Sequence, residues 1–342
     1  MKCELKALVK ERLYKLYGIL LLDELKLKFN KIYEKDRDIY KIENNINDNC
    51  EILKVRGEKA VKNEDFDSDA TEDEYLRLRD AYEIVKDFPV GYSMSKPLDI
   101  FKEHKALLIS GCRGKNLKGY YLRILPVLPI YYFGLNKRIE RCGIWLAHFH
   151  KRSKKVGKYE KYIKNREKHL RRMVDGIKNS GFVIESMKYK QIFYKIKETR
   201  KESCIGLIHG NYTYRNIMVS DNEINLIDFE DSRYECIYYD VGQFVSEIIS
   251  MAIYLNFLPE FIVRYFIKKI KEIFIRSYES INELDYDEVA SYCAYHLIHH
   301  IYEYSSRSNL KWHKKLIVNY RKKYFKKRVD EILLSLYPTS IE

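Results

Sequence analysis

The stretch Ile208-His-Gly-Asn-Tyr-Thr-Tyr-Arg-Asn-Ile-Met-Val219 is the part of this 342-residue chain that decides its fold. Two short motifs follow it, Ile227-Asp-Phe-Glu230 and Tyr239-Asp-Val-Gly242. Between the first two segments, apolar runs on both sides of a polar turn predict a β-hairpin. Asn216 and Asp228 stand at its open end, twelve residues apart in the sequence. An amide oxygen and a carboxylate so placed are hard ligands that can converge on one metal ion.

These motifs resemble the aminoglycoside phosphotransferase and choline-kinase-like branch of the protein-kinase fold. The loop of that family reads H-G-D-x-x-x-x-N and is followed by I-D-F/W and D-L/V-A/G, which His209, Asn216, Asp228 and Asp240 match in register. The Tyr-rich loop is most similar to kinase-like spore-coat proteins and archaeal or bacterial phosphotransferases. The resemblance implies an α+β, two-lobed protein-kinase-like fold with a small β-rich amino-terminal lobe and a larger, mostly helical carboxy-terminal lobe. It also implies ATP and Mg²⁺ as cofactors, with Asn216 and Asp228 as the metal ligands.

One residue departs from the family pattern, because Asn211 stands where the family has a catalytic aspartate. An amide cannot accept a proton at neutral pH, although its oxygen can orient a hydroxyl group. The phosphoryl-transfer transition state is loose, so positioning and charge neutralisation supply most of the rate. Asn211 and His209 are therefore the predicted catalytic-loop residues, with His209 orienting the loop. Glu230 and Asp231 are alternative bases that the sequence does not position.

Upstream of this segment, Lys54 is the candidate lysine for the nucleotide phosphates. It lies in Glu51-Ile-Leu-Lys-Val-Arg56, an alternating run that predicts a strand. Arg56, on the same face of that strand, is the alternative. The resemblance implies an ion-pair partner on the next helix, where Glu74 fits the family's spacing and Glu72 is the alternative.

The same lobe offers a place for the nucleotide base. Ser110 and Cys112 lie in a kink after the short apolar strand at residues 106–109, where the family's hinge holds adenine by backbone hydrogen bonds. The resemblance therefore implies that Ser110 and Cys112 bind the cofactor. No glycine occurs in residues 31–49, so the sequence has no glycine-rich loop before the lysine strand.

The apolar periodicity and the changes in composition predict three segments. Leucines at helical spacing predict an amino-terminal helical extension over residues 1–30. The amino-terminal lobe follows over 31–110, with a hairpin and a helix of about 72–86. The carboxy-terminal lobe covers 111–342 and contains the catalytic hairpin at 205–230.

Composition limits where the protein acts and what it contacts. Seven scattered cysteines without a CxxC motif argue against a disulfide framework and a zinc site. No run approaches the ~18 apolar residues of a membrane span, so we expect no transmembrane segment and a cytoplasmic protein. The net charge of +14 is concentrated at 151–172 and 311–328, and these segments form either solvated surfaces or contacts with an anionic partner. No specific nucleic-acid motif accompanies them.

Three functions are consistent with these residues. The leading one is an ATP-dependent phosphotransferase acting on a hydroxyl of a small, possibly anionic molecule such as a sugar, an amino alcohol or a lipid precursor. The alternative is a non-catalytic kinase-like nucleotide-binding or scaffold protein, and the third is a basic membrane-surface or nucleic-acid binder. Lys54, Asn216 and Asp228 favour a working nucleotide site, with ATP and GTP both compatible, whereas Asn211 favours the scaffold.

Overall fold

The protein is described here by a computed structural model. The described residues are 3–18, 25–34, 37–44, 50–56, 70–124, 128–155, 160–182, 204–255, 257–306 and 312–336. They form two compact units: unit 1 comprises Met1–Tyr120 and Asn216–Ser232, and unit 2 comprises Tyr121–Arg215 and Arg233–Glu342. The predicted carboxy-terminal lobe contains the whole of residues 205–230, whereas the compact units divide this segment after Arg215.

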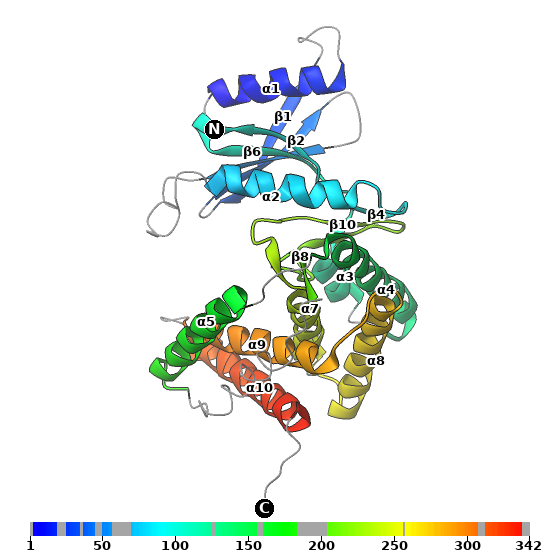
Figure 1. The fold of residues 1–342 in the computed structure, drawn as a ribbon, viewed down its shortest axis with the longest axis vertical. Coiled ribbons are helices and arrows are strands. Elements are labelled where there is room, and N and C mark those ends of the chain that lie inside the picture. Colours follow the sequence, from blue (N-terminus) through cyan, green and yellow to red (C-terminus); the bar gives the residue numbers. More distant parts are fainter. Residues whose placement is uncertain are drawn as a thin grey trace, which may run out of the picture. The chain divides into compact units, whose positions relative to one another are not determined.

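Unit 1 is built on a five-stranded antiparallel sheet with the order β1-β2-β3-β6-β5 (Figure 1). Its strands are β1 (Leu27–Glu34), β2 (Arg37–Asn44), β3 (Cys50–Arg56), β5 (Pro97–Phe101) and β6 (Ala106–Ser110). The expected amino-terminal hairpin is the β2–β3 pair, and the expected strand at 106–109 is β6.

One face of this sheet is covered by helix α1 (Cys3–Tyr17). The helix buries three residues at four-residue spacing, Leu5, Val9 and Leu13, in a core that it shares with the sheet. The prediction of a helix over the whole of residues 1–30 is wrong at its carboxyl end, because β1 begins at Leu27. Leu27 and Phe29 pack against the same core with the two-residue spacing of a strand.

The opposite face of the sheet carries Lys54. Leu53 of β3 is buried in the core under α1, so its neighbour Lys54 points to the other face. Helix α2 (Ala70–Val85), which is the predicted helix of about 72–86, contacts β5 and β6. Figure 1 shows α1 and α2 on opposite sides of the sheet.

A second sheet of unit 1 explains why residues 216–232 belong to it. Its order is β4-β10-β9-β7, with β4 (Tyr92–Met94), β7 (Lys115–Asn116), β9 (Ile217–Val219) and β10 (Ile224–Leu226). The expected hairpin is the antiparallel β9–β10 pair. Strand β10 also pairs with β4 in parallel, which fixes the hairpin in this unit.

Unit 2 is mostly helical. Its main helices are α4 (Leu128–Ser153), α5 (Glu160–Asn179), α7 (Tyr238–Met251), α8 (Glu260–Glu279), α9 (Tyr286–Ser305) and α10 (Trp312–Leu336). Helix α9 packs on α5, α7 and α10, and α4 packs on α8. The short helix α3 (Leu117–Ile124) spans the division between the units, and η3 (Lys102–His104) and η6 (Ala252–Leu255) are single 3₁₀ turns. Among the described helices, none combines the length and the apolar character that crossing a membrane requires.

A two-stranded sheet lies among these helices. Strand β8 (Ile205–Ile208) pairs antiparallel with β11 (Arg233–Cys236), with Ile208 opposite Arg233. The predicted catalytic hairpin over 205–230 is thus two structures, because its first strand pairs with β11 and only its second half forms the β9–β10 hairpin.

Candidate functional site

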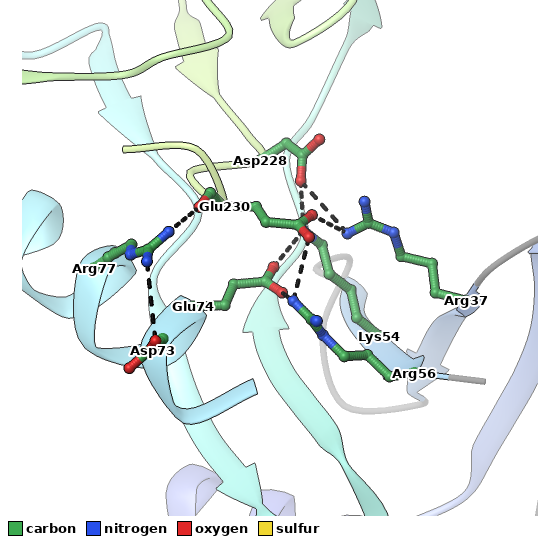
Figure 2. Close-up of polar contacts among 8 residues, drawn as sticks. All are labelled: Arg37, Lys54, Arg56, Asp73, Glu74, Arg77, Asp228 and Glu230. Atoms are coloured by element: carbon green, nitrogen blue, oxygen red, sulfur yellow. Dashed lines mark hydrogen bonds and ion pairs between the residues drawn. The ribbon is translucent and has the colours of Figure 1, made fainter. Parts of the chain in front are cut away.

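Lys54 lies at the centre of a charged cluster in unit 1 (Figure 2). Its Nζ is 2.9 Å from Oε1 of Glu74 and 2.8 Å from Oδ1 of Asp228. The Lys54 side chain is 11% exposed and that of Glu74 is 5% exposed, so solvent screens this pair little. The ion pair expected between the β3 lysine and the α2 glutamate is present. Glu72, the alternative partner, instead pairs with Lys102 on the surface.

Strand register explains why three cations share this face. Arg37 lies directly opposite Arg56 in the β2–β3 pair, and Ile39 lies opposite Lys54. Directly opposed residues point to the same side of an antiparallel pair, as do residues two apart in one strand. Arg37, Lys54 and Arg56 therefore all point away from the α1 core.

Glu230 binds the two arginines of this face. Its Oε2 is 2.6 Å from Nη1 of Arg37, and its Oε1 is 3.2 Å from Nη2 of Arg56. Arg56 also lies 3.4 Å from Oε2 of Glu74, and Arg77 of α2 donates to the backbone oxygen of Glu230 at 2.7 Å (Figure 2). Because both of its carboxylate oxygens are paired, Glu230 is a poor candidate for the base that the sequence analysis considered.

The electrostatics of the cluster follow from these pairings. Burial alone lowers the pKa of Lys54, but the charges of Asp228 and Glu74 outweigh it and raise that pKa above its ordinary value. Burial also lowers the pKa of Arg37, but the charges of Glu230 and Asp228 outweigh it and raise that pKa. Burial, followed by the charges of Glu230 and Asp228, raises the pKa of Asp231, the second alternative base. Lys54 and Arg37 are therefore charged at neutral pH.

Asp228 has the backbone conformation of a specialised position. Its φ is +69°, in the left-handed region that a non-glycine residue rarely adopts. Such strain of about 1–3 kcal/mol persists where the surrounding structure fixes it, and it is frequent at functional sites. The ion pair with Lys54 and the β10 strand that ends two residues earlier hold Asp228 in place.

The oxygen groups near Asp228 fit a hard divalent cation. Asn216 accepts a backbone hydrogen bond from Ile227 at 3.0 Å, so its backbone lies beside the residue that precedes Asp228. Carboxylate oxygens of Glu74, Asp228 and Glu230 lie within 4.8 Å of one another. Carboxylate and amide oxygens are the ligands that Mg²⁺ prefers. Asn216 and Asp228 have the ligand chemistry of the Mg²⁺ implied by the resemblance, and their role as its ligands stays a prediction.

In unit 2, Asp240 holds the loop that begins at His209. Its carboxylate accepts the backbone N–H of His209 at 2.6 Å and that of Gly210 at 2.9 Å. His150, which is fully buried, contacts the same carboxylate at 3.3 Å and Tyr278 at 2.9 Å. Burial lowers the pKa of His150, partly offset by its hydrogen bond with Asp240. His150 and Asp240 therefore hold this loop through buried hydrogen bonds.

The loop positions Asn211 through its neighbours. The Asn211 backbone N–H donates to Nδ1 of His209 at 3.2 Å, which links His209 to the loop that it is predicted to orient. Gly210 has φ +79°, which a glycine adopts without strain. Tyr212, buried beneath the loop, donates its hydroxyl to the backbone oxygen of Cys142 at 2.8 Å. Asn211 itself is half-buried.

The kink after β6 is more constrained than the sequence indicates. The backbone N–H of Ser110 donates to Lys96, and that of Gly111 donates to Cys50 at 2.7 Å. The Cys112 sulfur lies 3.2 Å from Oγ of Ser95, and burial raises the pKa of its thiol to about 11. The Ser110 amide is therefore committed to the sheet, which leaves its carbonyl and the Cys112 backbone as the candidate contacts for a base.

Some basic side chains of the segments at 151–172 and 311–328 make buried contacts within unit 2. Arg166 is 13% exposed and makes a bidentate pair with Glu235, at 2.6 Å for both bonds. Lys322 is buried with its Nζ 4.8 Å from the ring centre of Phe182. The exposed lysines of α10 are Lys314, Lys315, Lys323 and Lys327. Residues 156–159 and 311 lie outside the described residues.

Arg37 and Glu230 are the site residues whose role the sequence analysis missed. The sequence pattern predicts the two strands of the amino-terminal hairpin. The register that sets Arg37 opposite Arg56 also depends on the connection between β2 and β3. Ion pairs of Arg37 and Arg56 with Glu230 link residues far apart in the chain, so no local pattern reports them.

The comparisons with known proteins agree with this geometry. A family model of choline/ethanolamine kinases matches residues 137–331, more than half of the chain. A glucosamine kinase solved with glucosamine, ADP and inorganic phosphate is 10% identical, with a TM-score of 0.63 over 95% of this chain and 82% of that chain. An ethanolamine kinase of Plasmodium vivax is 15% identical, with a TM-score of 0.56 over 94% of this chain and 86% of that chain.

A third solved structure with the same fold is an amicoumacin kinase. This kinase, solved with AMP-PNP and Ca²⁺, is 13% identical, with a TM-score of 0.54 over 96% of both chains. No protein in the search of curated proteins matches the chain. These structural likenesses confirm the predicted protein-kinase-like fold, with a β-rich amino-terminal part and a mostly helical carboxy-terminal part.

Proposed function

The chain belongs to the choline/ethanolamine kinase family, and we propose that it transfers the γ-phosphoryl group of ATP to a hydroxyl group of a small molecule. The observation that carries this proposal is the pairing of Lys54 with both Glu74 and Asp228. A lysine held between a helix glutamate and the aspartate after a β-hairpin is the arrangement that phosphoryl-transfer sites of this fold use for the nucleotide phosphates.

We assign the donor side of the reaction to unit 1. Lys54 binds the nucleotide phosphates as a point charge, and Glu74 fixes the direction of its Nζ. Asn216 and Asp228 would hold Mg²⁺, which neutralises phosphate charge when it is bound. The backbone at Ser110 and Cys112 would bind the base, so that GTP could replace ATP only if these backbone contacts accept guanine.

The acceptor side is assigned to the loop that Asp240 holds. In this proposal Asn211 orients the acceptor hydroxyl by hydrogen bonding and does not take its proton, because an amide is no base at neutral pH. The solved relatives suggest acceptors to try, since their names include ethanolamine and glucosamine kinases. Sugars, amino alcohols and lipid precursors are thus the proposed substrate classes.

The test is ATP turnover against a panel of hydroxyl acceptors at saturating magnesium. We expect the wild-type protein to form ADP only with particular acceptors, and Lys54→Met to remove that turnover. The control is Lys86→Met, which removes a lysine of unit 1 that pairs with Glu83 on the surface. Equal turnover in the wild type and Lys54→Met would refute the assignment of Lys54.

A second candidate, a nucleotide-binding scaffold without transfer activity, is favoured by Asn211 alone. The same experiment separates the two functions when nucleotide binding is measured beside turnover. ATP binding that depends on Asp228, together with no turnover for any acceptor, would favour the scaffold. ATP binding that is unchanged in Asp228→Ala would refute the assignment of Asp228 as a metal ligand.

We also propose a cytoplasmic location, which rests on cysteine chemistry. All seven cysteines are free thiols, and four of them are buried. Free thiols persist in the reducing cytoplasm, whereas oxidising compartments favour disulfides.

The exposed lysines of α10 are the proposed contact with an anionic partner. Weakening of that contact as the salt concentration rises would test this proposal.

A further inference from the structure

The charged face of unit 1 holds two arginines to which the proposed function gives no task. Arg37 and Arg56 flank Lys54, and their side chains are 23% and 18% exposed. Both guanidinium groups point to the same Glu230 carboxylate, and Nη1 of Arg37 is also 3.9 Å from Oδ1 of Asp228 (Figure 2). The sheet face carries three cations, but the proposed function uses only one of them, Lys54. The positive charges of Arg37 and Arg56 therefore need a separate explanation.

The position of Arg37 matters as much as its charge. It is the first residue of β2 and follows the connection from β1, at the start of the sheet face that carries Lys54. Residues 31–49 contain no glycine, so a backbone that wraps closely around phosphates is not encoded there. A guanidinium group has five N–H donors in a rigid fork and can bind two phosphate oxygens at once. It can therefore supply the donors that backbone N–H groups supply in a glycine-rich loop.

We propose that Arg37 and Arg56 form a binding site for the β- and γ-phosphates of a nucleoside triphosphate. This site takes the place of a glycine-rich loop, and the proposal rests on the proposed function because it concerns the same nucleotide. Carboxylate and phosphate are both oxyanions that a guanidinium group binds bidentately. Glu230 therefore occupies the same donors that a phosphate would use, and binding exchanges one oxyanion for another.

The charge balance of the cluster makes this exchange measurable. Arg37, Lys54 and Arg56 carry three positive charges, and their carboxylate partners Glu74, Asp228 and Glu230 carry three negative ones. The cluster is thus neutral as a whole. Removing the Glu230 charge should strengthen the binding of a polyphosphate, whereas removing the Arg37 charge should weaken it.

The experiment measures binding of ATP, inorganic tripolyphosphate and adenosine by titration calorimetry, in EDTA so that no metal contributes. We expect Arg37→Ala to weaken ATP and tripolyphosphate binding about 10- to 100-fold, the loss typical of a charge-assisted bidentate contact. Arg37→Lys should recover part of this loss because it keeps the charge but not the fork. Glu230→Gln should tighten tripolyphosphate binding, and adenosine binding should be equal in all variants.

The matched control is Arg79→Ala, which removes an arginine from the exposed side of α2, where it pairs with Asp80 at 3.7 Å. Its polyphosphate binding should equal that of the wild type. If Arg37→Ala and Glu230→Gln both bind tripolyphosphate as the wild type does, the arginine site is refuted. If the wild type binds no ATP even with magnesium, the proposed function fails instead. Glu230→Gln retains all three cations, so it tests the site even if Arg37→Ala does not fold.

Discussion

Replacing Asp240 by asparagine tests how the loop of unit 2 is held. Asp240 is fully buried and accepts two backbone N–H groups, from His209 at 2.6 Å and from Gly210 at 2.9 Å. An asparagine has nearly the same shape but only one acceptor oxygen. Its NH₂ group would therefore face a backbone N–H or His150, and one buried donor would lose its acceptor.

The expected cost follows from these contacts. Losing a hydrogen bond to a charged group costs about 1.5–3 kcal/mol, and a buried donor left unpaired costs about 1–3 kcal/mol more. Together these losses should lower the unfolding free energy of Asp240→Asn by about 2.5–6 kcal/mol. For a unit of this size, each kcal/mol lowers the Tm by roughly 2–4 °C. We therefore expect the melting temperature of unit 2 to fall by about 10 °C.

The assay is thermal unfolding combined with hydrogen exchange at the His209 and Gly210 amides. Asp240→Asn should lower the Tm and speed exchange at these two amides. Asp175→Asn is the control, because it makes the same change at an exposed position of α5 and should leave both readouts as in the wild type. Unchanged exchange at His209 and Gly210 in Asp240→Asn would refute the bracing role.

Three further expectations follow from the structure. Asn211→Asp supplies a base where the family has one, and turnover should rise by up to ~10²–10⁴-fold; no turnover in either protein would favour the scaffold. Burial lowers the pKa of His300, but hydrogen bonds with Glu247 and Glu303 outweigh it and raise the pKa to about 9. Its charged form stabilises the fold, so the unfolding free energy should fall as pH rises from about 6.5 to 9, and His300→Gln should flatten that slope. Burial raises the pKa of Glu51 from 4.5 to about 7, so the unfolding free energy should fall as pH rises from about 4.5 to 7 and stay at the lower level above pH 7. Glu51→Gln should keep a contact with the Tyr17 hydroxyl and raise the unfolding free energy at pH 8, and no gain there would contradict the burial argument.

The site residues that could be predicted from the sequence are those marked by local patterns, namely strand alternation, motif spacing and a turn. The β3 strand alternates, so Lys54 and Leu53 had to lie on opposite faces, and the family spacing selected Glu74 on α2. The β9–β10 hairpin was recognisable from its turn, which set Asn216 near Asp228. In these cases the deciding interactions lie within one element or between neighbours in the chain.

The predictions that differ from the structure concern non-local contacts. The leucine spacing in residues 1–30 fits a helix throughout, but pairing with β2 makes a strand of Leu27–Glu34. Strand β10 joins unit 1 through its parallel pairing with β4, in which Leu226 lies opposite Met94, 132 residues earlier in the chain. No turn signal in the sequence reports a pairing over that separation. β-pairing partners are chosen by packing across the sheet, and the sequence of one strand does not encode its neighbour.

The charged cluster of unit 1 is better explained by ligand binding than by stability. Taking charges out of water costs several kcal/mol per ion, and apolar residues of similar volume often stabilise a fold equally well. The cluster nevertheless gathers oxygens of Glu74, Asp228 and Glu230 within 4.8 Å of one another, which is repulsive unless cations separate them. Lys54 and the two arginines supply that charge, and Asp228 adopts a strained backbone beside them. A fold that needed only a stable core has no use for this arrangement, whereas a site for a polyanion and a divalent cation requires opposite charges held close together.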